Sequence, residues 1–171
     1  MTESRLLARL RTAGGPPPAP SARAALLAGL GGFSATLTMF SLADWSGAAF
    51  IMAPFGASCV LAFALPDSPL SQPRNIVGGH LIAAAIGLGM MSLFGTSAAI
   101  MALAVGLAIA AMLVTRTTHA PAGANPLLVM LAGADWSFLV TPVLAGATTL
   151  VAVALLYHRC TGRRDYPRYW L

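Results

Sequence analysis

The sequence predicts an all-α membrane protein that crosses the lipid bilayer several times. Of its 171 residues, 57% are hydrophobic and 9% are charged, whereas a soluble domain has about 25% charged residues. The charges are also unevenly placed, because residues 24–158 contain only Asp44, Asp67, Arg74, Arg116 and Asp135. This composition excludes an ordinary soluble enzyme, and the high hydrophobicity excludes a disordered chain.

Long apolar runs locate the membrane-crossing helices, each of which needs about 20 apolar residues. In chain order the runs are residues 24–43, 48–65, 76–115, 120–134 and 136–157. The third run has no Asp, Glu, Lys or Arg and is long enough for two crossings with a hinge at residues 94–97. Since no run carries a polar stripe of helical period, each is typical of a helix surrounded by lipid or by other helices. The prediction is therefore about six hydrophobic helical segments.

Both ends of the chain are basic. We expect residues 1–23 to form a flexible, Pro-rich cytoplasmic tail rather than a targeting peptide, because residues 14–20 break any helix before the first apolar run. Residues 24–158 form the membrane domain, and residues 159–171 form a second basic tail. Eight of the ten Arg lie in the tails, and basic residues collect on the cytoplasmic side of a membrane. The prediction is a multi-pass protein of the bacterial inner membrane with both termini in the cytoplasm.

Cytoplasmic termini require an even number of crossings, and two arrangements satisfy this. Six crossings place Arg74 and Arg116 on the same side as the tails, which the charge distribution favours. The alternative is four full spans plus two re-entrant half-helices, which places these two Arg outside. The shortness of residues 120–134 favours this second arrangement.

A short internal match divides the membrane domain into two halves. Residues 53–58 read Ala-Pro-Phe-Gly-Ala-Ser, and residues 120–125 read Ala-Pro-Ala-Gly-Ala-Asn, an offset of 67 residues. Each half then contains a helix, a Pro/Gly-broken helix and a helix, so three crossings per half would give two inverted repeats. A chance match is the alternative in a chain this rich in Ala and Gly. Paired interrupted segments in two halves point to the central site of a transporter.

Polar groups near the two breaks predict an anion-binding site. A helix that restarts after a proline has free backbone N–H groups and a positive dipole end, both of which favour anions. The predicted substrate-binding residues are the breaks and the hydrogen-bonding or basic side chains around them: Pro54, Gly56, Ser58, Arg74, Asn75, His80, Arg116, His119, Pro121, Gly123 and Asn125. The alternative role for the two Arg is to anchor loops at lipid headgroups, and for His80 it is helix packing.

Other chemistries find little support in the sequence. The three His are far apart, with no Cys or carboxylate at ligand spacing, so we expect no metal and no cofactor. Phosphate-loop and nucleophile-elbow motifs are missing, so we expect no enzyme. The Arg-rich tails lack interleaved aromatic residues on a soluble surface, so we expect no nucleic acid partner. The expected partners are the lipid bilayer and a small inorganic anion. Small residues four apart, such as Gly79, Ala83 and Gly87, fit either packing within the chain or a homo-oligomer.

Three stretches together resemble one family of membrane proteins. They are Ala53-Pro-Phe-Gly-Ala-Ser58, the run from Pro66 to His80 with its Pro-Arg-Asn and Gly-Gly-His sequences, and His119-Ala-Pro-Ala-Gly-Ala-Asn-Pro126. Over nearly all of residues 24–157 the chain resembles the HPP family, named for a His-Pro-Pro motif. Here Ala120 stands at the first proline of that motif, and Pro121 keeps the second.

The resemblance implies an integral membrane protein with four spans. Because members in chloroplasts and cyanobacteria are implicated in nitrite transport, it also implies a small-anion transporter or channel, with nitrite or nitrate as the first candidates. The alternative is a membrane scaffold or sensing component that carries no flux.

Overall fold

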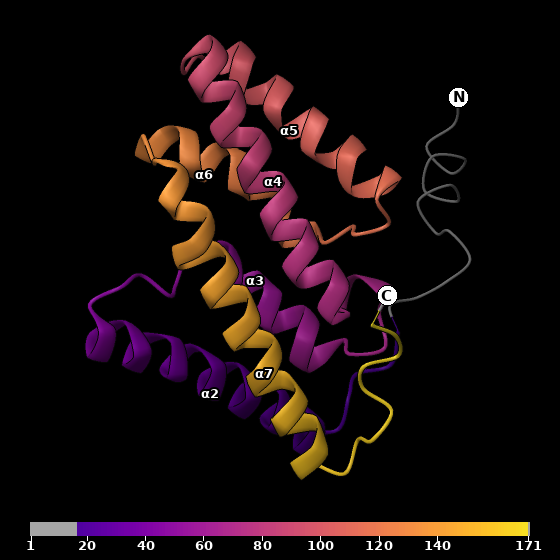
Figure 1. Ribbon diagram of the computed structural model, residues 1–171. Helices are drawn as coiled ribbons and strands as arrows, with labels where there is room; N and C mark the ends of the chain where they lie inside the picture. Colours follow the sequence, from indigo (N-terminus) through magenta and orange to yellow (C-terminus); the bar gives the residue numbers. More distant parts are fainter. Residues whose placement is uncertain (1–16, 171) are drawn as a thin grey trace, which may run out of the picture.

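The computed structural model describes residues 17–170, and helices make up its regular structure (Figure 1). In chain order the elements are α2 (Ala22–Ser46), α3 (Pro54–Cys59), η1 (Val60–Ala64), η2 (Pro69–Ser71), α4 (Pro73–Phe94), α5 (Ala98–Val114), η3 (Ala120–Ala124), α6 (Asn125–Ala132), η4 (Trp136–Leu139), η5 (Val140–Leu144) and α7 (Ala145–Cys160). No β-strand occurs among these residues, so the predicted all-helical class is confirmed. The predicted tail covers residues 1–23, and residues 1–16 of it lie outside the described part of the chain.

Three helices are long and apolar enough to cross a membrane, and three are shorter. The long ones are Ala22–Ser46, Pro73–Phe94 and Trp136–Cys160. The shorter apolar helices are Pro54–Ala64, Ala98–Val114 and Ala120–Ala132. Large apolar side chains of α2, including Leu26 and Phe33, are more than 60% exposed. A protein surface of this kind is covered by lipid in an integral membrane protein.

Two of the predicted helical segments are interrupted. Residues 48–53 are not helical, and the helix of the second segment begins only at Pro54. Ala53 has helical dihedral angles of −51° and −40°, and Pro54 takes the first helical position, where its missing N–H leaves no hydrogen bond unmade. The last segment is also interrupted, because Thr141 has extended dihedral angles of −132° and 123° before Pro142. The second segment was predicted to be a Pro/Gly-broken helix, whereas the interruption at Thr141 in the last segment was not predicted.

The start of α2, the end of α7 and the loops that flank α4 and α5 meet at one end of the structure (Figure 1). We call this the tail-side end. The start of α2 lies there beside the end of α7, since Ala24 and His158 line one groove. The loops before α4 and after α5 also meet there, because Arg74 Nη2 donates to Thr115 O at 2.9 Å. Arg74 and the loop that contains Arg116 thus lie at the same end as the C-terminal segment.

Helix α4 is the centre of the structure, and its glycines let other elements come close. Figure 1 shows α4 between α5 and α6. A Cβ atom on Gly79 would lie 2.7 Å from His119 Cβ, and one on Gly87 would lie 2.7 Å from Pro126 Cα. These two glycines therefore serve packing within the chain, which was one of the two uses that the small-residue spacing predicted. Close contact of α4 with η3 and α6 is what brings polar side chains together in the interior.

Candidate functional site

Four polar side chains meet in the interior of the helix bundle. Ser58 of α3, His80 of α4, His119 before η3 and Asn125 at the start of α6 are each 0% exposed. His80 lies seven residues into α4, about 10 Å along the helix axis. Polar groups inside a membrane domain are costly and mark functional sites. We call these four residues the polar cluster.

The two Pro/Gly motifs supply one member of the cluster each. Ser58 lies one turn after Pro54, which begins α3, and Asn125 follows Pro121 at the same spacing. Both side chains reach His80, although they approach its ring from opposite edges. The matching positions of the two motifs therefore converge on a single histidine.

Ser58 bridges the two histidines. Its Oγ lies 2.9 Å from His80 Nε2 and 2.8 Å from His119 Nε2. The other ring nitrogen of His119, Nδ1, lies 2.7 Å from Leu70 O. Phe55 packs edge-on against the His80 ring at a centroid distance of 5.0 Å. The bridge is thus enclosed by apolar and backbone groups.

The partners at each end of the bridge assign the hydrogen atoms along it. Leu70 O can only accept, so His119 Nδ1 donates, and Nε2 of the neutral ring is an acceptor. The Ser58 hydroxyl proton has two acceptors within reach, His119 Nε2 at 2.8 Å and Pro54 O at 3.2 Å, and the shorter contact assigns it to His119. At the other end, the Asn125 amide nitrogen lies 3.0 Å from both His80 Nδ1 and His80 O. Asn125 Oδ1 also lies 3.2 Å from His80 Nδ1. Because the Ser58 hydroxyl proton goes to His119, His80 Nε2 must donate to Ser58 Oγ, and His80 Nδ1 therefore accepts from the Asn125 amide nitrogen. The two hydrogen bonds therefore point in the same direction, with His80 donating to Ser58 and Ser58 donating to His119.

The other predicted site residues lie outside this cluster. Arg74 and Asn75 donate to Thr115 O and Thr118 O, both at 2.9 Å, so they hold the loop that precedes His119. Arg116 is exposed in the same loop. Neither Arg side chain contacts the polar cluster among the described residues, and the alternative role at lipid headgroups stays a prediction.

The two motif glycines also face away from the cluster, since a Cβ on Gly56 or Gly123 would meet nothing within 4 Å. Two contacts of the cluster were absent from the sequence predictions, namely the Phe55 ring and the Leu70 carbonyl. A backbone carbonyl leaves no signal in a sequence. Within residues 17–170, no group of three His, Cys, Asp or Glu could hold a metal ion.

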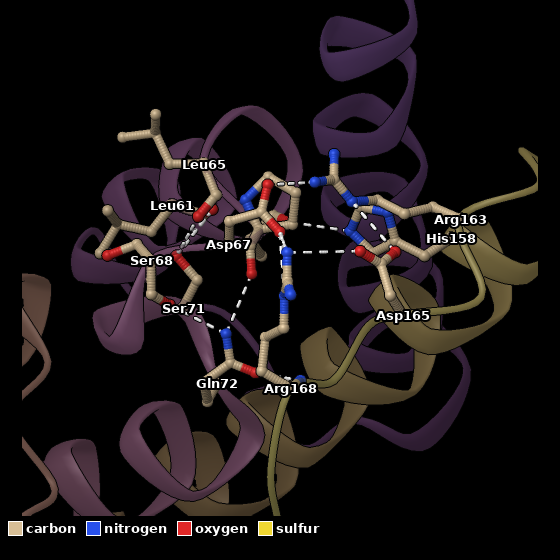
Figure 2. Close-up of polar contacts among 12 residues, drawn as sticks. Leu61, Leu65, Asp67, Ser68, Ser71, Gln72, His158, Arg163, Asp165 and Arg168 are labelled. Carbon is tan, nitrogen blue, oxygen red and sulfur yellow. Dashed lines mark hydrogen bonds and ion pairs between the residues drawn. The ribbon is translucent and has the colours of Figure 1, made fainter.

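The loop that presents Leu70 O is held by the C-terminal segment, residues 161–170 (Figure 2). Asp67 pairs with Arg163, and its Oδ1 lies 2.5 Å from Arg168 Nη2. Gln72 Oε1 accepts from the Arg168 backbone N–H at 2.8 Å, and Gln72 Nε2 donates to Pro66 O at 2.9 Å. We call this set of contacts the C-terminal clasp.

Two buried side chains continue the clasp toward the helices. Tyr166 is 5% exposed, and its hydroxyl donates to Ser71 O at 3.0 Å. Ser71 Oγ in turn donates to Leu65 O at 2.7 Å. Because Leu70 lies next to Ser71, the clasp fixes the carbonyl that holds His119. The end of the chain is thereby connected to the polar cluster.

Replacing Asp67 with Asn should release the C-terminal segment. The hydrogen bonds from Arg168 and Arg163 hold the pKa of Asp67 below its usual range. Because the pKa of Asp67 is lower in the folded protein, its ion pairs stabilise the clasp fully at pH values above the ordinary Asp pKa. This stabilisation is lost as the pH falls through the lowered pKa of the folded protein. At neutral pH, we expect trypsin to cleave D67N after Arg168 several times faster than the wild type. Asp135→Asn, at the other end of the bundle, is the control, and equal cleavage of all three proteins would contradict the clasp.

Comparison with known proteins gives a family and two relatives. A family model described as the HPP transmembrane region matches residues 17–167. Two curated proteins of Dictyostelium discoideum, both named only as transmembrane proteins, are 40% and 38% identical to this chain over 129 and 128 residues. The matches cover 71% and 70% of this chain but 42% and 45% of the relatives. The chain therefore spans less than half the length of these relatives. No solved structure matches.

Proposed function

Because this chain belongs to the HPP family of integral membrane proteins, we propose that it carries a small inorganic anion, nitrite or nitrate, across the membrane at the polar cluster. The observation that carries the proposal is the meeting of two proline-initiated helices at one buried group of Ser, His and Asn side chains. Transporters place their substrate sites where such interrupted segments face each other. The sequence resemblance adds nitrite and nitrate as the substrates.

The polar cluster suits an anion chemically. Serine, histidine and asparagine supply hydroxyl, ring and amide donors, which can replace part of the hydration shell of an oxyanion. No carboxylate of the described chain contacts the cluster. An anion at this place would therefore meet donors without a repelling negative charge.

The described conformation is closed, and transport requires it to open. All buried side-chain nitrogen and oxygen atoms of the described residues have hydrogen-bond partners. An anion must therefore displace one of these bonds, and the contact of the Asn125 amide nitrogen with His80 Nδ1 is one that joins two helices, α6 and α4. Phe55 gives an approach, since one side of its ring contacts His80 and another lines a groove between α2 and α3 with Thr36 and Met52.

The proposed arrangement in the membrane is six alternating segments in two inverted halves. It places the tail-side end, with Arg74 and the C-terminal segment, on the cytoplasmic side of a bacterial inner membrane. Support comes from the accumulation of Arg at that end. The polar cluster then lies nearer the cytoplasmic face, with the apolar part of α4 toward the other side.

Flux into liposomes tests the proposal. Vesicles with the purified full chain should take up nitrite or nitrate well above empty vesicles. Asn125→Leu should lower the rate at least tenfold, because it removes both bonds to His80 while leaving a side chain of similar size. Ser92→Ala is the control, since the Ser92 hydroxyl bonds only within α4, to Leu88 O. Wild-type vesicles that pass neither anion would overturn the proposal and leave a scaffold or sensing component as the function.

A further inference from the structure

We infer that a proton is the co-substrate of the anion, and that the Ser58-bridged histidines carry it through the membrane domain. This inference rests on the proposed function and specifies its mechanism. Two independent features of the described residues support it. One is the directional hydrogen-bond chain, and the other is that His80 and His119 are the only side chains of the polar cluster that can carry a positive charge.

An anion in an apolar interior needs a positive partner. An isolated charge transferred there is strongly destabilised unless it is paired. The polar cluster contains no Arg, and its only side chains that can become cationic are His80 and His119. One proton on this pair would give the cluster a single positive charge. An anion and the protonated cluster would then form a neutral pair.

The ionisable groups on the elements around the cluster bond or face elsewhere. They are Cys59 of α3, which faces Thr36; Asp67 before η2, which pairs with Arg163 and Arg168; Arg74 of α4, which donates to Thr115 O; Arg116 after α5, which is exposed; and His158 of α7, whose Nε2 bonds to Ala62 O. Among the described residues, none of these side chains contacts His80 or His119. The positive charge must therefore come from protonation of the histidine pair itself.

The hydrogen-bond chain gives the proton a continuous path. A proton that binds His80 Nδ1, after the Asn125 amide turns away, makes that ring an imidazolium. The His80 Nε2 proton then moves to Ser58 Oγ as the Ser58 hydroxyl proton moves to His119 Nε2. His119 is now the imidazolium, and its Nδ1 proton can leave past Leu70. One proton enters at His80 and one leaves at His119, and Ser58 ends as a neutral hydroxyl.

The exit of this path is at the tail-side end. His119 Nδ1 contacts the carbonyl of Leu70, and the neighbouring Pro69 carbonyl accepts from the exposed Tyr169 hydroxyl at 3.1 Å. The His80 end points instead toward Asn125, which begins α6. The two ends of the hydrogen-bond chain thus face different elements. Opening of η2 or of α6 would expose one end at a time, as alternating access requires.

Coupled proton entry is the test of this inference. The full-length protein is placed in liposomes that contain a pH-sensitive dye, and nitrate is added outside without an ionophore. Nitrate is the chosen probe because nitric acid is a strong acid and does not leak protons as nitrous acid does. We expect internal acidification with about one proton per nitrate, at a rate that valinomycin and potassium leave unchanged. If only nitrite is carried, the same assay is run with nitrite after subtraction of the empty-vesicle leak.

Variants locate the proton path. Ser58→Ala should lower anion-dependent acidification at least tenfold, whereas Ser92→Ala should match the wild type. Anion entry without acidification, accelerated by valinomycin, would overturn the proton inference while the proposed anion function stands. Neither anion nor proton entry would overturn both. Acidification that does not depend on the anion, or that survives in S58A, would overturn the coupling through the Ser58 bridge.

Discussion

Replacing Gly87 with alanine is expected to destabilise the protein by about 2–3 kcal/mol, the upper part of the range for overpacking a core. The new Cβ atom would lie 2.6 Å from Val129 Cγ2 and 2.7 Å from Pro126 Cα. The valine side chain can rotate, but the proline backbone at the start of α6 cannot move without displacing Asn125. The same substitution should therefore disturb the polar cluster as well as the packing of α4.

Gly89 on the same helix is a matched control for Gly87. A Cβ atom on Gly89 would meet nothing within 4 Å, and alanine favours a helix over glycine by about 1 kcal/mol. Thermal unfolding of the purified protein in detergent should show G87A well below the wild type and G89A equal to it or above it. If the two variants unfold at the same temperature, α4 and α6 do not pack as closely as described.

Replacing His119 with asparagine is expected to stop anion flux while most of the folded stability remains. The Asn side-chain nitrogen takes the place of His119 Nδ1, so it can still donate to Leu70 O. Nothing in asparagine reaches the position of Nε2, so the contact with Ser58 is lost. We expect flux to fall at least tenfold and the free energy of unfolding to fall by about 1–2 kcal/mol, as for partial removal of a buried side chain.

His119→Ala is the companion of the asparagine variant. It also leaves Leu70 O without its donor, and an unpaired buried group adds about 1–3 kcal/mol to the cost of the cavity. Unfolding and liposome flux measured on both variants separate two roles of His119. Loss of flux in H119N with a smaller loss of stability than in H119A indicates a role in transport. Normal flux in H119N would place His119 off the path.

The positions of the helices were largely predictable, because long apolar runs have few other solutions in a bilayer. Segments 24–43 and 76–115 correspond to α2 and to the α4 and α5 pair. Composition could not place the start of α3, since an apolar extended stretch and an apolar helix have the same hydrophobicity. The proline at position 54 is the local signal for that start, because proline is favoured at the first helical position.

The cluster was predictable in residue types but not in geometry. Ser58, His80, His119 and Asn125 were all among the predicted site residues, as donors near two helix breaks. The sequence contains no distance between elements, so Arg74 and Arg116 were grouped with them. In the structure, Arg74 begins α4 and bonds to the loop after α5, and Arg116 lies exposed in that loop.

The C-terminal clasp had no local signal. It joins Asp67 to Arg163 and Arg168 across about a hundred residues, and charge counting assigned those Arg to a tail. Long-range pairing of this kind depends on the folded arrangement of α4 and α7, which no sequence window contains.

The shared histidine makes the two halves unequal. At the 67-residue offset, the position that corresponds to His80 is Ala147, and the position that corresponds to His119 is Met52. Both counterparts are apolar and buried, so only one of the two motifs is flanked by a group that can hold a proton. The two halves of the membrane domain therefore differ in their buried polar groups, and in the proposed transport cycle the inward and outward half-cycles would present chemically different surfaces to the same ion.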